Sequence, residues 1–445
     1  MSSGTDRITD TSPGVTGSEL CRGCRIAGRR LLRFTIKAKL PEVAAIEETG
    51  GQGRDNLAEM TVEIHGSVAA GWEPLYEQFA FNFAHRGELG ASVCATYEGR
   101  TVVDLWAGDR DTDGNPWLVD TIAVINSCTK GGVALACHLL ADRGLLDLDA
   151  PVFEIWPEFA HGAKAGVTTR MMLNHTTGVA AFRDDLPGDS ALDWDYMCDR
   201  VAAEEPWWEP GTRNGYHLMS FGWVAGELVR RASGQSLGAF FREEVAEPVG
   251  ADFWIGLPTE EHHRVSPLRP FRPSKNETFA AFTDAFLADP TGLQGRAWRN
   301  RGGAKGDSPD VWSAELGGGG GIANARGLAK IYQSCATGQF VSASQLERMS
   351  RVSVGTECDA MLLLPTRFSE GFMLRMENRT SRTGDQDSVN IREGAFGHVG
   401  AGGSIGFADP QLGLSMGYVM NQMGKSVLLD ARGEALVDAA YGCAT

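Results

Sequence analysis

The chain has little lysine and no long apolar run, and both absences limit what it can be. Only eight of its 445 residues are lysine, and its formal net charge is -16. A chain with this net charge would repel nucleic-acid phosphates, which argues against a nucleic-acid partner. No apolar run approaches the roughly 18 residues that a membrane-spanning helix needs. We therefore expect a soluble protein with no membrane partner.

The cysteines follow no regular pattern. There are nine, an odd number scattered through the chain, unlike the dense and even sets of secreted disulfide frameworks. Cys21 and Cys24 form a single CxxC pair, and no second pair or histidine pair follows at zinc-site spacing. Arg29 and Arg30 precede no signal-like apolar stretch or cleavage site. We expect reduced thiols, no metal and a cytoplasmic location.

The first part of the chain predicts an extension, a helix and a hairpin. Residues 1–59 are rich in glycine, serine, threonine and charge, so we expect a disordered extension outside the domains. From Trp72 to His85 the apolar residues recur at steps of three and four, which predicts an amphipathic helix. Strand-like runs at 91–97 and 101–107, separated by a short glycine-containing turn, predict a β-hairpin.

The rest of the chain returns from helices to strands. Helical stretches broken by glycine and proline clusters fill the middle. Strands are then predicted over 396–399, 404–408 and 414–420, and a closing helix over 426–441. This order predicts one α/β domain assembled from both ends of the chain, with a helical domain inserted. The predicted boundaries are 60–125 and 326–445 for the α/β domain and 126–325 for the helical domain.

Ser127 and Lys130 are the main candidates for catalysis. Of the eight lysines, only Lys130 has a serine three residues before it, and apolar residues then recur at helical spacing. Ser127 is therefore expected in the first turn of a buried helix, where free amides and the helix dipole favour negative charge. Lys130 projects from the same face, and a desolvated amine there is suited to take the serine proton. A solvated lysine at a polar helix start is the alternative for this motif alone.

Two further elements stand in the order that such chemistry requires. Tyr216 follows a turn-rich run that contains Trp208, and a tyrosine held by a rigid loop is suited to relay a proton. His398 and Gly400 lie in a late strand, where an edge strand presents its backbone to a substrate and glycine permits close approach. Each of these residues alone is also compatible with a packing role.

Other features are weaker candidates. Ser404 lies in a GxSxG pattern, but that motif needs a following helix and a later histidine, and the last histidine is His398. The five glycines at 317–321 lack the Lys-Ser/Thr of a phosphate-binding loop, and a helix is expected from Ile322. They are interpreted as a tight passage near the site. His175 closes a short predicted helix and is interpreted as a structural residue.

In combination, these motifs resemble a known superfamily. An SxxK motif, a tyrosine about ninety residues later and a late H-x-G are similar to the serine β-lactamases and penicillin-binding proteins, most of all to family VIII carboxylesterases. The resemblance covers roughly residues 70–440 and includes the landmarks LNHTTG at 173–178 and WEPG at 208–211. It implies a β-lactamase-like α+β fold, in which an antiparallel sheet is flanked by N- and C-terminal helices and carries an inserted, mainly helical domain.

The resemblance also implies the roles of the site residues. Ser127 would be the acylated nucleophile, and Lys130 and Tyr216 the base system, with either as the general base. The backbone amides of Ser127 and Ala401 would form the oxyanion hole. No cofactor is implied.

Departures from the β-lactamase pattern favour esters. Where β-lactamases carry Tyr-x-Asn this chain has Tyr216 and Leu218, and where they carry Lys-Thr-Gly it has His398 to Gly400. The missing side-chain amide, ammonium and hydroxyl are suited to binding the amide and carboxylate of a β-lactam. A neutral ester has no carboxylate, so its binding depends less on these groups. Trp208 is expected to line an apolar pocket for the acyl or alcohol group.

The sequence therefore predicts a serine hydrolase that cleaves short-chain carboxylic esters through an acyl-enzyme on Ser127. Its partner would be a small-molecule ester, and no oligomeric state follows from the pattern. Acyl transfer or β-lactam hydrolysis by the same chemistry is one alternative. A catalytically silent binding protein on the same fold is the other.

Overall fold

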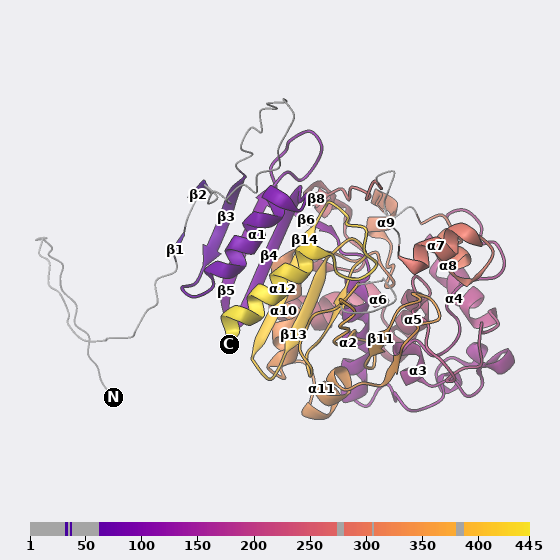
Figure 1. Ribbon diagram of the computed structural model, residues 1–445. Helices are drawn as coiled ribbons and strands as arrows, with labels where there is room; N and C mark the ends of the chain where they lie inside the picture. The colour runs from indigo at the N-terminus through magenta and orange to yellow at the C-terminus, as the bar shows by residue number, and fades with distance from the viewer. Residues whose placement is uncertain (1–31, 34–35, 38–61, 274–279, 305–306, 380–386) are drawn as a thin grey trace, which may run out of the picture.

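The computed structural model describes residues 32–33, 36–37, 62–273, 280–304, 307–379 and 387–445 (Figure 1). Most of the predicted N-terminal extension, including Cys21 and Cys24, lies outside these residues. Two short strands from the extension are described, β1 (Leu32–Arg33) and β2 (Ile36–Lys37), and both pair with β3 (Glu63–Val68). Within the described ranges, no helix is both long enough and apolar enough to span a membrane.

The main sheet is built from both ends of the chain. It has eight strands, in the order β1-β3-β5-β4-β14-β13-β12 with β2 also on β3, and all its pairs are antiparallel. The N-terminal hairpin meets the C-terminal strands where β4 pairs with β14, as predicted for a domain assembled from both ends. The strands not yet bounded are β4 (Gly90–Tyr97), β5 (Arg100–Gly108), β12 (Phe396–Val399), β13 (Ile405–Asp409) and β14 (Leu414–Met420).

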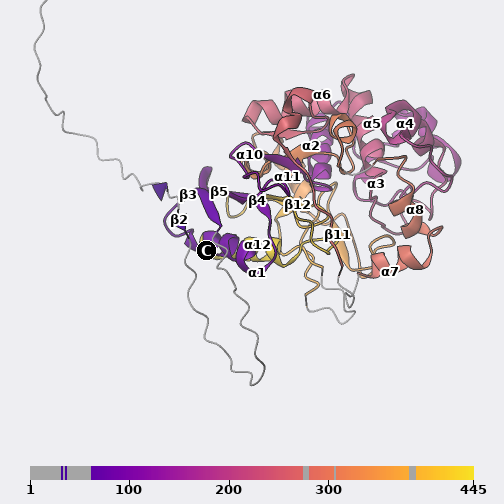
Figure 2. The same cartoon turned by 90° about the horizontal axis from the view of Figure 1, so that it is seen from above.

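Helices cover both faces of this sheet. Helices α1 (Glu73–His85) and α12 (Ala431–Ala444) pack together on one face, and α10 (Ala325–Ala336) covers the other (Figures 1 and 2). The period of two along β13 explains this division. Phe407 stacks on Tyr441 of α12, with ring centroids 5.7 Å apart, whereas the preceding Gly406 lies against Leu328 of α10. The predicted α+β fold, an antiparallel sheet flanked by N- and C-terminal helices, is confirmed.

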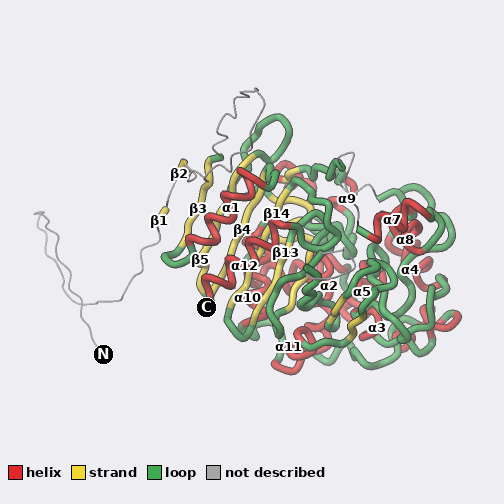
Figure 3. Tube along the Cα trace, in the orientation of Figure 1, coloured by secondary structure: helices red, strands yellow, loops and turns green. Residues whose placement is uncertain are grey.

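Among the regular elements between the two parts of the sheet, helices predominate, and long loops connect them (Figure 3). The longest of these helices, α2 (Cys128–Asp142), is buried along almost its whole length, and α5 (Phe221–Ser233) packs on it. The shorter helices are α3 (Thr169–Leu173), α4 (Trp194–Ala203), α6 (Leu237–Phe241), α7 (Ala281–Ala288), α8 (Leu293–Arg299) and α9 (Pro309–Ser313).

Small sheets accompany this helical region. β6 (Ile122–Val124), β7 (Phe253–Trp254), β8 (Val265–Ser266) and β9 (Ile322–Ala323) form a four-stranded sheet in the order β7-β9-β6-β8. Because β6 pairs with β9, the chain enters and leaves the helical region at adjacent points. Near its end the chain adds α11 (Ala343–Ser350) and the pair β10 (Val354–Thr356) and β11 (Thr366–Phe368). The domain boundaries stay a prediction.

Two helix starts differ from the prediction, and side-chain caps explain both. The helix expected from Ile322 begins at Ala325, because Asn324 Oδ1 accepts from the Gly327 amide at 2.9 Å and Ile322 is in a strand. The closing helix begins at Ala431 rather than at residue 426, because the Asp430 carboxylate accepts from the first free amides of α12.

Candidate active site

Ser127 caps the N-terminus of α2, between the small sheet and the helical region. The helix starts at Cys128, and the preceding Asn126 is in the left-handed region with φ 45°. This kink turns the chain sharply after β6, so that Ser127 stays partly exposed while the helix behind it is buried. Among the described residues, no group accepts a hydrogen bond from the Ser127 amide, as is common at the start of a helix.

Lys130 lies one turn further along α2 and is completely buried. Its Nζ is 2.9 Å from Ser127 Oγ, 2.7 Å from the Leu218 carbonyl oxygen and 2.6 Å from the Gly318 carbonyl oxygen. Burial lowers the pKa of Lys130 well below its usual value, and no carboxylate among the described residues contacts the amine to oppose this effect. Gly318 belongs to the five-glycine run, so the run does pass beside the site.

Tyr216 faces the same two residues. Lys130 Nζ lies 4.8 Å from the centroid of its ring, which stacks on Phe368 with an interplanar angle of 9°. The Tyr216 amide donates to Asp359 Oδ1 at 3.0 Å. Burial raises the pKa of Tyr216, and interaction with Ser127 opposes that rise. The hydroxyl does not meet the geometry of a hydrogen bond with any described group, so it faces Ser127 without being bonded to it.

His398 reaches the site from β12. Its Nδ1 is 2.8 Å from the Val399 carbonyl oxygen, and because a carbonyl only accepts, Nδ1 carries the proton. Burial, together with the nearby Lys130, lowers the pKa of His398 to about 3. The ring is therefore neutral, and its Nε2, which has no partner among the described residues, is an acceptor. The His398 ring centroid is 6.0 Å from that of Tyr216.

Gly400 and Ala401 follow His398 beyond the end of β12. A Cβ on Gly400 would lie 2.2 Å from the Ile125 carbonyl oxygen, so only glycine fits there. The Gly400 amide donates to the carbonyl oxygen of Ser404, just before β13, at 2.8 Å, and the next amide in the chain is that of Ala401. It donates to no described group, while the Ala401 carbonyl accepts from Asn126 Nδ2 at 2.8 Å.

Trp208 packs against the segment that carries Tyr216. A Cβ on Gly215 would lie 2.6 Å from the Trp208 ring, and the ring meets His217 edge to face at 6.3 Å. Trp208 is half-buried. It therefore supports the Tyr216 backbone, and its lining of a substrate pocket stays a prediction.

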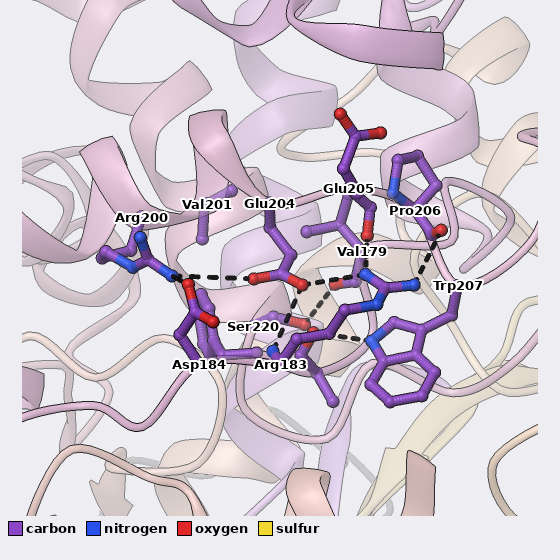
Figure 4. Close-up of polar contacts among 12 residues, drawn as sticks. Val179, Arg183, Asp184, Arg200, Val201, Glu204, Glu205, Pro206, Trp207 and Ser220 are labelled. Carbon is purple, nitrogen blue, oxygen red and sulfur yellow. Dashed lines mark hydrogen bonds and ion pairs between the residues drawn. The ribbon is translucent and has the colours of Figure 1, made fainter. Parts of the chain in front are cut away.

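The loop that leads to Trp208 is held by a polar network centred on Arg183 (Figure 4). The guanidinium donates to the buried Glu204 carboxylate at 2.9 Å, to the Pro206 carbonyl oxygen at 3.0 Å and to that of Glu205. It also lies over the Trp207 ring, 4.3 Å from the centroid. These contacts anchor the loop immediately before Trp208.

Neither Ser404 nor His175 forms a hydrogen bond with Ser127 or Lys130 in the described parts of the chain. Ser404 is buried just before β13, without a helix after it, and no described group bonds its hydroxyl. His175 lies behind Tyr216, with ring centroids 4.8 Å apart, and its Nδ1 accepts from the His217 amide at 3.2 Å. Ser404 is therefore followed by a strand and not by the helix that its motif requires, and the structural role of His175 stays a prediction. Sequence reasoning missed the contacts of the Leu218 and Gly318 carbonyls and of Asn126, because backbone groups and a lone asparagine leave no motif.

Comparisons with known proteins agree on one family. A family model described as Beta-lactamase matches residues 73–440. The Esterase/beta-lactamase LipL of Mycobacterium tuberculosis is 33% identical over 380 residues, which cover 81% of this chain and 83% of that protein. The crystal structure of a family VIII carboxylesterase is 38% identical with a TM-score of 0.73, covering 86% of this chain and 100% of that one. A penicillin-binding protein homolog from Caulobacter crescentus is 32% identical with a TM-score of 0.76, covering 85% and 99%.

Proposed function

This chain belongs to the beta-lactamase family, as its motifs predicted, and we propose that it is a serine esterase that cleaves short-chain carboxylic esters through an acyl-enzyme on Ser127. The observation that carries the proposal is the set of contacts around Lys130 Nζ. A neutral amine has two N–H bonds, and the carbonyls of Leu218 and Gly318 accept both. The remaining lone pair then faces Ser127 Oγ at 2.9 Å, ready to accept its proton.

In the first half-reaction, Ser127 Oγ attacks the ester carbonyl carbon as its proton passes to the base system. The carbonyl oxygen becomes an oxyanion, which the free amides of Ser127 and Ala401 would stabilise. The tetrahedral intermediate then collapses, the C–O bond to the alcohol breaks, and the alcohol leaves with the proton. In the second half-reaction, water attacks the acyl-serine, the bond between the acyl carbon and Ser127 Oγ breaks, the carboxylic acid leaves, and the proton that water gave up restores the Ser127 hydroxyl.

Lys130 and Tyr216 share the handling of this proton. The neutral lysine is the group in direct contact with Ser127, which supports it as the base in acylation. Tyr216 keeps its proton at neutral pH because burial raises its pKa, so it is suited to donate to the leaving alcohol and to regain the proton from water. His398 Nε2, an unpaired acceptor, would receive a hydrogen bond from the leaving alcohol or from the attacking water.

The names of similar proteins support ester hydrolysis and leave β-lactams as the second candidate. The name of LipL joins both activities, and the family VIII structure is a carboxylesterase. In the present site, a neutral His398 lies where a cation would hold the carboxylate of a β-lactam. We therefore place esters first.

Intact-protein mass spectrometry would test this function directly. The protein is incubated with p-nitrophenyl esters of graded acyl length and, separately, with a penicillin, while turnover is followed by absorbance. The proposal expects an acyl adduct that maps to Ser127 and faster turnover of short esters. Absence of any adduct would instead favour a binding protein on this fold.

We also propose that the protein works in a reducing compartment, the cytoplasm. The described cysteines are all free, and five of them are buried: Cys94, Cys128, Cys137, Cys198 and Cys335. Buried thiols without disulfides are typical of intracellular proteins.

A further inference from the structure

A buried ion pair reaches the turn that carries Ala401. Arg432, in the first turn of α12, has a side chain that is 4% exposed, and its Nη1 lies 2.8 Å from Oε1 of the completely buried Glu88 carboxylate. The other end of the guanidinium, Nη2, donates to the Gly402 carbonyl oxygen at 3.0 Å. One side chain thus connects α12, the segment before β4 and the 400–403 turn.

The turn itself is tightly constrained. Gly402 and Gly403 adopt positive φ values of 94° and 124°, and the Gly403 amide donates to the Gly400 carbonyl oxygen at 3.0 Å. The Gly402 carbonyl accepts from the Gly424 amide at 2.9 Å as well as from Arg432. Every backbone carbonyl from Gly400 to Gly402 therefore has a donor, and of the four amides from Gly400 to Gly403 that of Ala401 alone has no acceptor among the described residues.

Arg432 is in turn held rigidly. Asp430 Oδ2 accepts from its Nε at 2.9 Å and from its Nη2 at 2.7 Å, and the Tyr418 hydroxyl donates to the second oxygen of Glu88. A buried ion pair is weak evidence for stability, because apolar residues of similar volume often stabilise a core equally well. What a forked guanidinium provides here, and an apolar side chain does not, is a donor with a defined direction toward the Gly402 carbonyl.

We propose that Arg432, oriented by Glu88, is a positioning residue that sets the direction of the Ala401 amide in the oxyanion hole. This inference rests on the proposed function, because it requires an oxyanion at that amide. Arg432 does not contact the reacting atoms and acts only through the 400–403 turn. A misdirected amide stabilises the oxyanion of the tetrahedral intermediate less well, but it changes the binding of the uncharged ester little. The substitution should therefore lower kcat and leave KM nearly unchanged.

The test compares Arg432→Lys with the parent enzyme. Lysine keeps the charge but has no fork to reach both Glu88 and Gly402. We measure kcat and KM for p-nitrophenyl butyrate, and the inhibition constant of phenylboronic acid, which becomes tetrahedral and anionic on a serine oxygen. The proposal expects kcat to fall at least about tenfold, the inhibition constant to rise in parallel and KM to stay within about threefold. This fall in kcat is smaller than the effect of removing an oxyanion donor completely, because the Ala401 amide is still present but misdirected.

Two further variants keep the test decisive. Arg348→Lys is the matched control. Arg348 lies on α11, outside the site, and its Nε is 2.6 Å from the buried Glu370 carboxylate, so this variant should leave kcat, KM and the inhibition constant unchanged. If Arg432→Lys does not fold, Tyr418→Phe, which releases one oxygen of Glu88, should show the same parallel change at smaller size. The positioning role would be overturned if the inhibition constant stayed at the parent value. It would also be overturned if kcat fell only as much as the fraction of folded protein. Failure of the proposed function would be distinct, because the parent enzyme would then form no adduct on Ser127.

Discussion

Lys130 Nζ lies 2.9 Å from Ser127 Oγ and is held there by two backbone carbonyls, those of Leu218 and Gly318. Within the part of the chain that the structure describes, the amine has no carboxylate partner to keep it charged, and burial lowers its pKa. A lysine in this environment differs from Lys330 on α10, whose Nζ donates to the exposed Gly250 carbonyl. The position in the fold, not the residue type, makes Lys130 suited to act as a base.

Ser127→Ala should abolish ester turnover, and Ser404→Ala should leave most of it. Ser127 Oγ contacts the Lys130 amine, whereas the buried Ser404 hydroxyl has no hydrogen-bond partner in the part of the chain that the structure describes. Rates of p-nitrophenyl butyrate hydrolysis, with the mass of any acyl adduct, measure both variants. If activity survived in the Ser127 variant and disappeared in the Ser404 variant, Ser404 would be identified as the nucleophile.

Lys130→Ala and Tyr216→Phe should each lower kcat/KM by at least about a hundredfold, the effect typical of a lost proton-transfer group. Tyr332→Phe is the matched control for the tyrosine, because the Tyr332 hydroxyl is also buried without a described partner but faces Gly131 rather than Ser127. Circular dichroism verifies that each variant is folded. Near-native rates in either site variant would remove that residue from the mechanism.

The pH profile should report Lys130 and not the histidines. The neutral amine accepts the proton, so kcat/KM should fall as pH falls through the lowered pKa of Lys130. His217 and His398 have pKa values of about 4 and about 3, so neither changes charge between pH 5 and 9. His398→Gln, which stays neutral, should therefore reduce activity without moving the acidic limb, measured as kcat/KM over that range. An acidic limb that disappears in this variant would assign it to His398 instead of Lys130.

Neutral esters should be better substrates than β-lactams. The neutral His398 ring offers an acceptor rather than a cation, so an anionic carboxylate gains little from it. We expect kcat/KM for a short p-nitrophenyl ester to exceed that for a penicillin by at least about a hundredfold, or roughly 2.7 kcal/mol.

His398→Lys tests the electrostatic reason for this preference. A protonated lysine would attract the carboxylate of the penicillin. The ratio of kcat/KM for the ester to kcat/KM for the penicillin should therefore decrease. The effect should be partial, because the burial that lowers the pKa of His398 would also disfavour the charged form of a lysine at this position. Equal parent rates on both substrate classes would contradict the esterase preference.

Local patterns in the sequence determined the elements and the reactive residue types. Alternation and helical spacing predicted α1, the β4–β5 hairpin and β14 closely, because each depends on which face of a short segment is buried. The SxxK spacing places Ser127 and Lys130 one turn apart on any helix. The start of α12 was missed by a few residues, because the cap formed by Asp430 outweighs the apolar pattern before it.

The tertiary structure alone decided what those residues can do. Segments far apart in the chain bury Lys130 and supply its two carbonyl partners. Distant segments also bury His398 and bring Arg432 within hydrogen-bond distance of the Gly402 carbonyl oxygen. Burial and hydrogen bonding set a pKa and a donor's direction, and both depend on neighbours that a one-dimensional pattern does not contain. The sequence therefore determined which reactive residue types the chain offers and their spacing, and the packing of distant segments decided the pKa values and hydrogen bonds of these residues.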